Sequence, residues 1–260
     1  MPNILETIAD YARERVSNAK QKVSLEEMKS KARSMNIDDS FPFEKSLKSG
    51  DISFICECKK ASPSKGFIAE DFPYLDIAKD YEKAGAAALS VLTEPKWFMG
   101  NDEFLKDISS NVGIPCLRKD FTVDEYMIYE AKTLGASAIL LICSLLSEEK
   151  IKEYIDIADS LGLSALVEAH DEDEIAMAVR AGARIIGVNN RNLKDFTVDV
   201  HNSERLRKLV PKEVLFVAES GIKTSEDIDV LRKANVNAVL IGETLMRAEN
   251  KKKMLDELRG

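Results

Sequence analysis

An acid and a base end the same apolar stretch near the start of this sequence. In DISFICECKKASPSKG, residues 51–66, an apolar run with Ile52, Phe54 and Ile55 is followed by the carboxylate of Glu57 and the amine of Lys59. Side chains alternate across a β-strand, so Glu57 and Lys59 share one face while Cys56 and Cys58 share the other. A carboxylate held beside an amine changes the proton affinity of both groups, which is what general acid–base catalysis requires. The stretch therefore indicates proton-transfer chemistry.

Polar residues also end the other apolar runs of the sequence. If these runs are the strands of one barrel, alternation turns one set of side chains inward around a single ring. For any one pair, a structural salt bridge at the rim is the alternative. Burying several unlike charges together is costly, however, so such clusters are more often functional. The inward set is Glu57, Lys59, Lys119, Phe121, Glu168, Asn189, Arg191 and Glu219.

A repeated unit would position these residues. Helical stretches that end at Gly or Asn are followed by short apolar runs, as in AKTLGASAILLI and LRKANVNAVLIG. The runs are continuously apolar, which indicates a parallel sheet covered on both faces. An open doubly wound sheet and a closed barrel both fit this alternation, but eight units within about 210 residues favour the barrel. We expect an α/β fold in which residues 1–260 form a single TIM (βα)8-barrel domain.

Residues 1–50 precede the repeat. NILETIADYARERVSNAK and SLEEMKSKARSM predict two amphipathic helices, and PFEKSLKSG predicts a short third one. We expect an N-terminal helical extension that either caps one mouth of the barrel or packs on its outer wall. The sequence does not decide between these two positions.

Glycine-containing turns follow the last two predicted strands, in AESGI and LIGET. In barrels of this kind, the loops at these positions and a helix N-terminus commonly hold a phosphate group. One such motif by itself indicates no more than a turn before a helix. Two on adjacent strands, with SPSKG nearby, favour a small phosphorylated molecule as the partner.

Composition argues against several other partners and cofactors. The formal net charge of −8 disfavours nucleic acid and anionic membranes. The four cysteines and two histidines lack metal-binding spacing, and no G-x-G-x-x-G follows a strand, so we expect no metal and no cofactor. We expect His170 to be a satisfied rim residue. Free buried thiols, with neither a signal peptide nor a spanning segment, predict a cytoplasmic protein.

Seven ordered motifs resemble those of the indole-3-glycerol phosphate synthase family. They are CECKKASPSKG, SVLTEPKWFMG, LRKDF, ALVEAH, IGVNNRNL, AESGI and LIGETLM, and the resemblance covers residues 1 to about 250. It implies a barrel with a helical extension over the active-site mouth. It also implies conversion of 1-(2-carboxyphenylamino)-1-deoxyribulose 5-phosphate to indole-3-glycerol phosphate in tryptophan biosynthesis, with loss of carbon dioxide and water and without metal or cofactor.

The resemblance also implies roles for individual residues. Ring closure needs an acid, and a lysine of lowered pKa can serve as one. By the resemblance, Lys119 would be this general acid and Glu168 the general base. Lys59 would hold the substrate carboxylate, and Glu57 would orient Lys59. The implied catalytic set is Lys119, Glu168, Lys59, Glu57, Asn189 and Ser220. The implied substrate-binding set is Ser62, Phe98, Phe121, Leu140, Arg191, Glu219, Gly221 and Gly242, with Phe98, Phe121 and Leu140 against the aromatic ring.

Glu243 departs from those family members that carry Ser after LIG. A carboxylate cannot solvate phosphate, so we expect the Glu243 side chain to turn away and leave it out of the site. Two other functions stay open: a phosphoribosylanthranilate isomerase-like barrel, which would use Cys and Asp at strand ends, and a non-catalytic phosphosugar-binding barrel. We expect a monomer, although the sequence does not exclude an oligomer.

Overall fold

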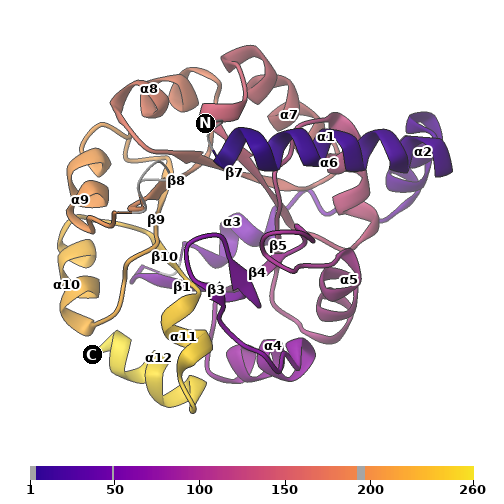
Figure 1. The fold of residues 1–260 in the computed structure, drawn as a ribbon. Coiled ribbons are helices and arrows are strands. Elements are labelled where there is room, and N and C mark those ends of the chain that lie inside the picture. Colours follow the sequence, from indigo (N-terminus) through magenta and orange to yellow (C-terminus); the bar gives the residue numbers. More distant parts are fainter. Residues whose placement is uncertain (1–3, 49, 192–196) are drawn as a thin grey trace.

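Eight parallel strands close into a ring in the computed structural model, which describes residues 4–48, 50–191 and 197–260 (Figure 1). The hydrogen-bonded order β1-β10-β9-β8-β7-β6-β5-β4 brings the last strand back to the first. This confirms the predicted TIM barrel. The barrel strands are β1 (Ser53–Cys58), β4 (Ala88–Leu92), β5 (Cys116–Lys119), β6 (Ala138–Ile142), β7 (Ser164–Ala169), β8 (Ile185–Asn189), β9 (Leu215–Glu219) and β10 (Ala238–Ile241).

Helices surround the ring of strands (Figure 1). Most of them begin at a polar side chain that accepts a hydrogen bond from the backbone of the first turn, as Asp124, Ser147 and Thr224 do, which satisfies an otherwise unpaired N–H. The helices after the first barrel strand are α4 (Tyr74–Lys83), α5 (Asp102–Asn111), α6 (Glu125–Thr133), α7 (Glu148–Ser160), α8 (Glu172–Arg180), α9 (His201–Arg207), α10 (Ser225–Lys233), α11 (Glu243–Arg247) and α12 (Lys251–Arg259), with a 3-10 turn η1 (Cys143–Leu145).

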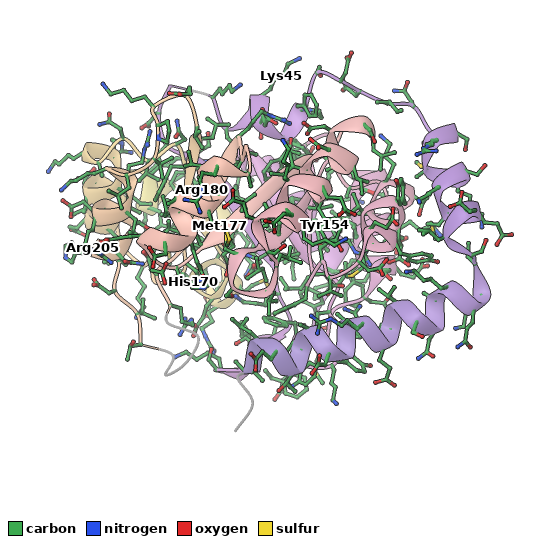
Figure 2. All side chains as sticks on the ribbon, turned by 90° about the horizontal axis from the view of Figure 1, so that it is seen from above. Lys45, Tyr154, His170, Met177, Arg180 and Arg205 are labelled. Atoms are coloured by element: carbon green, nitrogen blue, oxygen red, sulfur yellow. The ribbon has the colours of Figure 1, made fainter. Side chains whose placement is uncertain are left out.

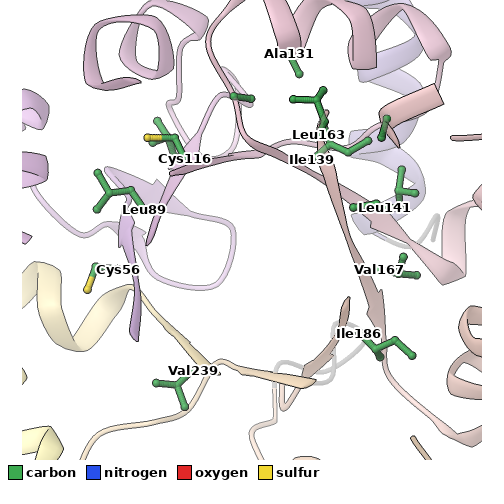
Figure 3. Packing of buried hydrophobic residues seen from close by; sticks show 14 of the residues in the cluster. Cys56, Leu89, Cys116, Ala131, Ile139, Leu141, Leu163, Val167, Ile186 and Val239 are labelled. Carbon is green, nitrogen blue, oxygen red and sulfur yellow. The ribbon is translucent and has the colours of Figure 1, made fainter. Parts of the chain in front are cut away.

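Alternation along the strands divides the apolar core into two layers. Outward-facing side chains pack between the strands and the helices (Figure 3), whereas inward-facing ones such as Leu117, Leu140 and Val217 fill the barrel. All four cysteines are free and buried. Each belongs to the outer layer, so Cys56 and Cys58 face away from Glu57 and Lys59, as alternation predicts.

The N-terminal helices occupy three different places. Leu5 and Ile8 of α1 (Ile4–Lys22) pack with Phe121, beyond the C-terminal end of β5, whereas Phe43 of α3 (Pro42–Ser46) packs into the other end of the barrel. Figure 2 shows α1 along one end of the barrel and Lys45 of α3 at the opposite end. Helix α2 (Leu25–Ser34) lies on the outer wall against α6. Both positions considered for the extension are therefore occupied, by different helices.

The loop after β1 contains a short antiparallel hairpin that sequence patterning does not predict. Its strands are β2 (Ala61–Ser62) and β3 (Gly66–Phe67). Two-residue strands are too short to show any periodicity. The hairpin nevertheless has a clear consequence, because it brings Ser62 to the mouth of the barrel.

Candidate active site

A cavity of about 580 Å³ opens at the C-terminal ends of the barrel strands. Helix α1 contributes Ile4, Leu5 and Ile8 to its wall. All the residues of the implied catalytic and substrate-binding sets line this cavity. They are Glu57, Lys59, Ser62, Phe98, Lys119, Phe121, Leu140, Glu168, Asn189, Arg191, Glu219, Ser220, Gly221 and Gly242. The fold thus brings the whole predicted set together, while the roles assigned to them stay predictions.

Glu57 and Lys59 form an ion pair at the end of β1. Lys59 Nζ lies 2.5 Å from Glu57 Oε1, and Ser90 on the neighbouring β4 donates to Glu57 Oε2 at 3.4 Å. Burial by itself would raise the pKa of Glu57, but Lys59 and Lys119 outweigh it and lower that pKa. Gly242 faces this pair, and a Cβ there would overlap both charged groups. The pair therefore depends on a glycine from the last strand.

Lys119 lies at the centre of the charged ring. Its Nζ is 2.5 Å from Glu219 Oε2 and 3.8 Å from Glu168 Oε2. Burial would lower the pKa of Lys119, but Glu219, Glu168 and Glu57 together raise it above the usual 10.5. The expectation that Lys119 has a lowered pKa is therefore wrong for this arrangement, because three carboxylates from three other strands favour the ammonium form.

Glu219 is the most weakly acidic carboxyl group of the ring. Burial, helped by the negative charge of Glu168 and opposed by Lys119, raises the pKa of Glu219 to about 7. Its Oε1 is buried and has no hydrogen-bond partner among the described residues. That oxygen lies where a side chain on Gly187 would otherwise be. The raised pKa thus reflects burial, while the adjacent Lys119 ammonium favours the carboxylate form of Glu219.

Glu168 has the opposite character. Its Oε1 accepts a hydrogen bond from Asn189 Nδ2 at 3.2 Å and lies 3.3 Å from Nε2 of His170. Burial would raise the pKa of Glu168, but His170 and Lys119 lower it to about 2. Glu168 is thus ionised at neutral pH and available to accept a proton.

An apolar wall lies beside the charged ring. The rings of Phe98 and Phe121 have their centroids 6.3 Å apart at an interplanar angle of 42°, and Leu140 lines the cavity with them. The buried carboxylate of Glu94 accepts hydrogen bonds from the backbone N–H groups of Lys96, Trp97 and Phe98 at 2.7 to 2.9 Å. Glu94 therefore fixes the loop that presents Phe98.

The turns after β9 and β10 line another part of the cavity. Ser220 and Gly221 both have positive φ, 66° and 83°, a conformation that costs a non-glycine residue energy and is common at functional sites. Lys65, Lys223 and Arg247 also line the cavity. Several cations and a strained turn thus border the region expected to hold a phosphate.

Glu243, which we expected to leave out of the site, is part of the cavity wall. Its Oε1 accepts a hydrogen bond from Arg247 Nε at 3.2 Å and lies 4.0 Å from Lys65 Nζ. These two cations balance its charge.

Asp120 was not selected from the sequence, because alternation turns it away from Lys119. It is buried and lines the cavity. Both of its oxygens accept hydrogen bonds from Arg15 of α1, at 2.7 and 3.1 Å. No local pattern could have revealed this contact, because the two residues are 105 positions apart. It holds α1 beside the mouth of the barrel.

Over residues 4–48, 50–191 and 197–260, no group of three or more His, Cys, Asp or Glu side chains is placed to hold a metal ion. Within the same ranges, no helix has both the length and the apolar character needed to cross a membrane.

Comparison with known proteins gives a consistent family. The family model described as Indole-3-glycerol phosphate synthase matches residues 5–258. A protein of that name from Ruminiclostridium cellulolyticum is 58% identical over 257 residues, which cover 99% of both chains. Another from Lachnoclostridium phytofermentans is 51% identical over 267 residues, 98% of both. The solved structure of 3-hexulose-6-phosphate synthase aligns with a TM-score of 0.65 over 80% of this chain and 98% of that one, and its 14% identity shows the fold alone.

Proposed function

Since the chain belongs to the indole-3-glycerol phosphate synthase family, we propose that its barrel cavity closes the indole ring with the residues described above. The reaction is that of a carboxy-lyase of tryptophan biosynthesis. It converts 1-(2-carboxyphenylamino)-1-deoxyribulose 5-phosphate to indole-3-glycerol phosphate, carbon dioxide and water. The observation that carries the assignment of roles is the position of the Lys119 ammonium, 3.8 Å from the Glu168 carboxylate inside one cavity.

The chemistry of the cavity matches the three parts of this substrate. Phe98 and Phe121 offer a surface for the aromatic ring, since aromatic side chains pack well on one another. Lys59 is the cation nearest the end of β1 and would hold the substrate carboxylate. The turns containing Ser220 and Gly242 would hold the phosphate through their backbone N–H groups.

Ring closure requires an acid. The aromatic carbon that bears the carboxylate attacks the ketone carbon, and the ketone oxygen takes up a proton as the new bond forms. We assign this proton to Lys119, which its three carboxylate neighbours keep protonated. Loss of carbon dioxide then restores the aromatic ring.

Dehydration requires a base and a second acid. Glu168 removes a proton from the carbon beside the ring nitrogen, while Lys59 protonates the departing hydroxyl group. Lys119 and Lys59 each donate a proton to the substrate and Glu168 accepts one, so the substrate takes up one proton in total. When a carboxylate leaves as carbon dioxide, the overall reaction consumes one proton, so the three assignments balance.

The assignments are tested by Lys119→Ala and Glu168→Gln. We expect each to lower kcat by about a hundredfold or more, the usual scale for a proton-transfer group, when indole formation from the ribulotide is followed by fluorescence. Lys83→Ala and Glu103→Gln, at exposed positions, are the matched controls. Wild-type turnover by either cavity variant would refute its role.

Assays on the same preparation test the alternatives. An isomerase would turn over phosphoribosylanthranilate but not the ribulotide, and a binding protein would turn over neither. The structure gives the isomerase little support, because no cysteine of the described chain lines the cavity. A monomeric state and a location in the cytosol stay predictions, the former testable by light scattering.

A further inference from the structure

His170 lies behind the Glu168 carboxylate and is not part of the cavity wall. Its Nε2 is 3.3 Å from Glu168 Oε1, and its Nδ1 is 3.1 Å from Glu174 Oε2 on α8. The side chain is only 19% exposed. Figure 2 places His170 toward the end of the barrel that α1 covers. The imidazole therefore bridges two carboxylates, one from the reactive ring and one from the surrounding helices.

This geometry favours a doubly protonated imidazole. A neutral imidazole has one donor and one acceptor nitrogen, so one nitrogen would direct its lone pair at a carboxylate oxygen. An imidazolium presents a donor to each carboxylate. The contact with Glu168 lacks the alignment of a full hydrogen bond, so it acts chiefly as an ion pair.

The other groups packed around the His170 imidazole do not favour its neutral form. The described elements beside His170 present Glu168 from β7 and Glu174 from α8, while Asn202 of α9 donates to the His170 carbonyl at 3.4 Å. The Cys143 thiol of η1 is directed at the carbonyl of Glu174, and burial raises the pKa of that thiol. The charged groups that face the imidazole are thus both anionic.

We propose that His170 is a positioning residue for Glu168: an imidazolium, held by Glu174, that keeps the Glu168 carboxylate ionised and aimed into the cavity. The proposal rests on the proposed function, in which Glu168 is the base. It assigns a specific task to each neighbour, since Glu174 orients the imidazole and Asn189 donates a hydrogen bond to the same Glu168 oxygen.

The charge on His170 has a consequence for catalysis. Burial would lower the pKa of His170, but Glu168 and Glu174 raise it to about 10, so the cation persists at neutral pH. Next to that cation, Glu168 stays ionised even in mildly acidic solution. After Glu168 has accepted a proton, the same cation favours its release, which resets the base for the next turnover.

The charge can be measured without any activity. The chain has two histidines, so in His201→Gln the remaining imidazole NMR signals belong to His170. We expect imidazolium nitrogen shifts at pH 8, and a titration midpoint that falls when Glu168→Gln or Glu174→Gln is added. A neutral imidazole at pH 7, or a midpoint that neither substitution lowers, would overturn the proposal. This readout stands even if the protein does not form indole.

Kinetics test the effect on Glu168. Losing an opposite charge at this distance raises a carboxyl pKa by about 1 to 3 units. We therefore expect the His170→Gln to wild-type ratio of kcat/KM to be flat between pH 7.5 and 6 and to fall as the pH approaches 4.5. Glu174→Gln should produce the same trend with a smaller fall. A ratio that does not change with pH would mean that His170 is only structural, and would overturn the proposal.

Discussion

Gly242→Ala should lower kcat/KM by displacing the ion pair that this glycine faces. A Cβ at position 242 would lie 2.8 Å from Lys59 Nζ and closer still to Glu57 Oε1. Since ordinary contact begins at 3.4 Å, Lys59 must move by about 0.6 Å, the difference between 3.4 and 2.8 Å, and Glu57 by more. The main chain at residue 242 has φ −112°, so alanine introduces no backbone strain and the effect is one of space alone.

Displacements of this size are costly in catalysis. Misplacing a reacting group by about 1 Å can lower the rate about a hundredfold. We therefore expect kcat/KM to fall about 10- to 100-fold, or about 1.4 to 2.7 kcal/mol of transition-state stabilisation. The free energy of unfolding should change little, because the displaced groups are side-chain ends beside an open cavity.

The assay is fluorescence-monitored indole formation, with urea unfolding as the stability measurement. Gly113→Ala is the matched control, because its Cβ would meet only the flexible end of Glu82 at 3.3 Å. Gly242 also belongs to the proposed phosphate site, so the double variant with Glu57→Gln separates the two effects. If alanine acts through the pair, Glu57→Gln costs less in the Gly242→Ala background than in the wild type. Additive losses, or wild-type kcat/KM in Gly242→Ala, would refute this reasoning.

Two further predictions concern stability. Arg15→Ala should lower the free energy of unfolding by about 1.5 to 3 kcal/mol, the usual contribution of hydrogen bonds to a charged group. The substitution removes two hydrogen bonds to the buried carboxylate of Asp120. An unchanged midpoint of urea unfolding would contradict a stabilising contact between Arg15 and Asp120. The difference in the free energy of unfolding between the wild type and His170→Gln should be largest below about pH 6.5 and should shrink as the pH rises toward 10. Folding raises the pKa of His170 from 6.5 to about 10, so the stability contributed by the imidazolium is lost as the pH rises through this folded-state pKa. A difference that grows above pH 7 in thermal unfolding would have the wrong sign.

The direction of the side chains could be predicted from the sequence because alternation along a strand has a strict period of two. Once β1 is placed, Glu57 must face the opposite way from Cys56, and the same holds for Lys119 and Arg118. The barrel itself follows from eight repeats of one pattern. These inferences need only local periodicity and the geometry of a closed parallel sheet.

Contacts between distant segments could not be predicted in this way. The pair between Arg15 and Asp120 joins α1 to the end of β5, although the two residues lie 105 positions apart in the sequence. The role of Glu94 depends on the fold of the turn that follows it, in which three backbone N–H groups donate hydrogen bonds to its carboxylate. The resemblance placed Gly242 in the substrate-binding set, but the space that its missing side chain leaves for Glu57 and Lys59 arises from the pairing of β1 with β10, two segments far apart in the sequence.

The pKa of Lys119 shows why local reasoning misjudged an acid whose position it predicted correctly. A lowered pKa leaves a lysine unprotonated near neutral pH, whereas in the proposed mechanism Lys119 must donate a proton to an oxygen that is becoming an alkoxide. Such an oxygen is more basic than any amine, so transfer is favourable even from a strongly held ammonium. The carboxylates of Glu219 and Glu168, 2.5 and 3.8 Å away, ensure that the proton is present when the ketone arrives. After transfer, they favour its prompt replacement, so the raised pKa prepares Lys119 for each turnover.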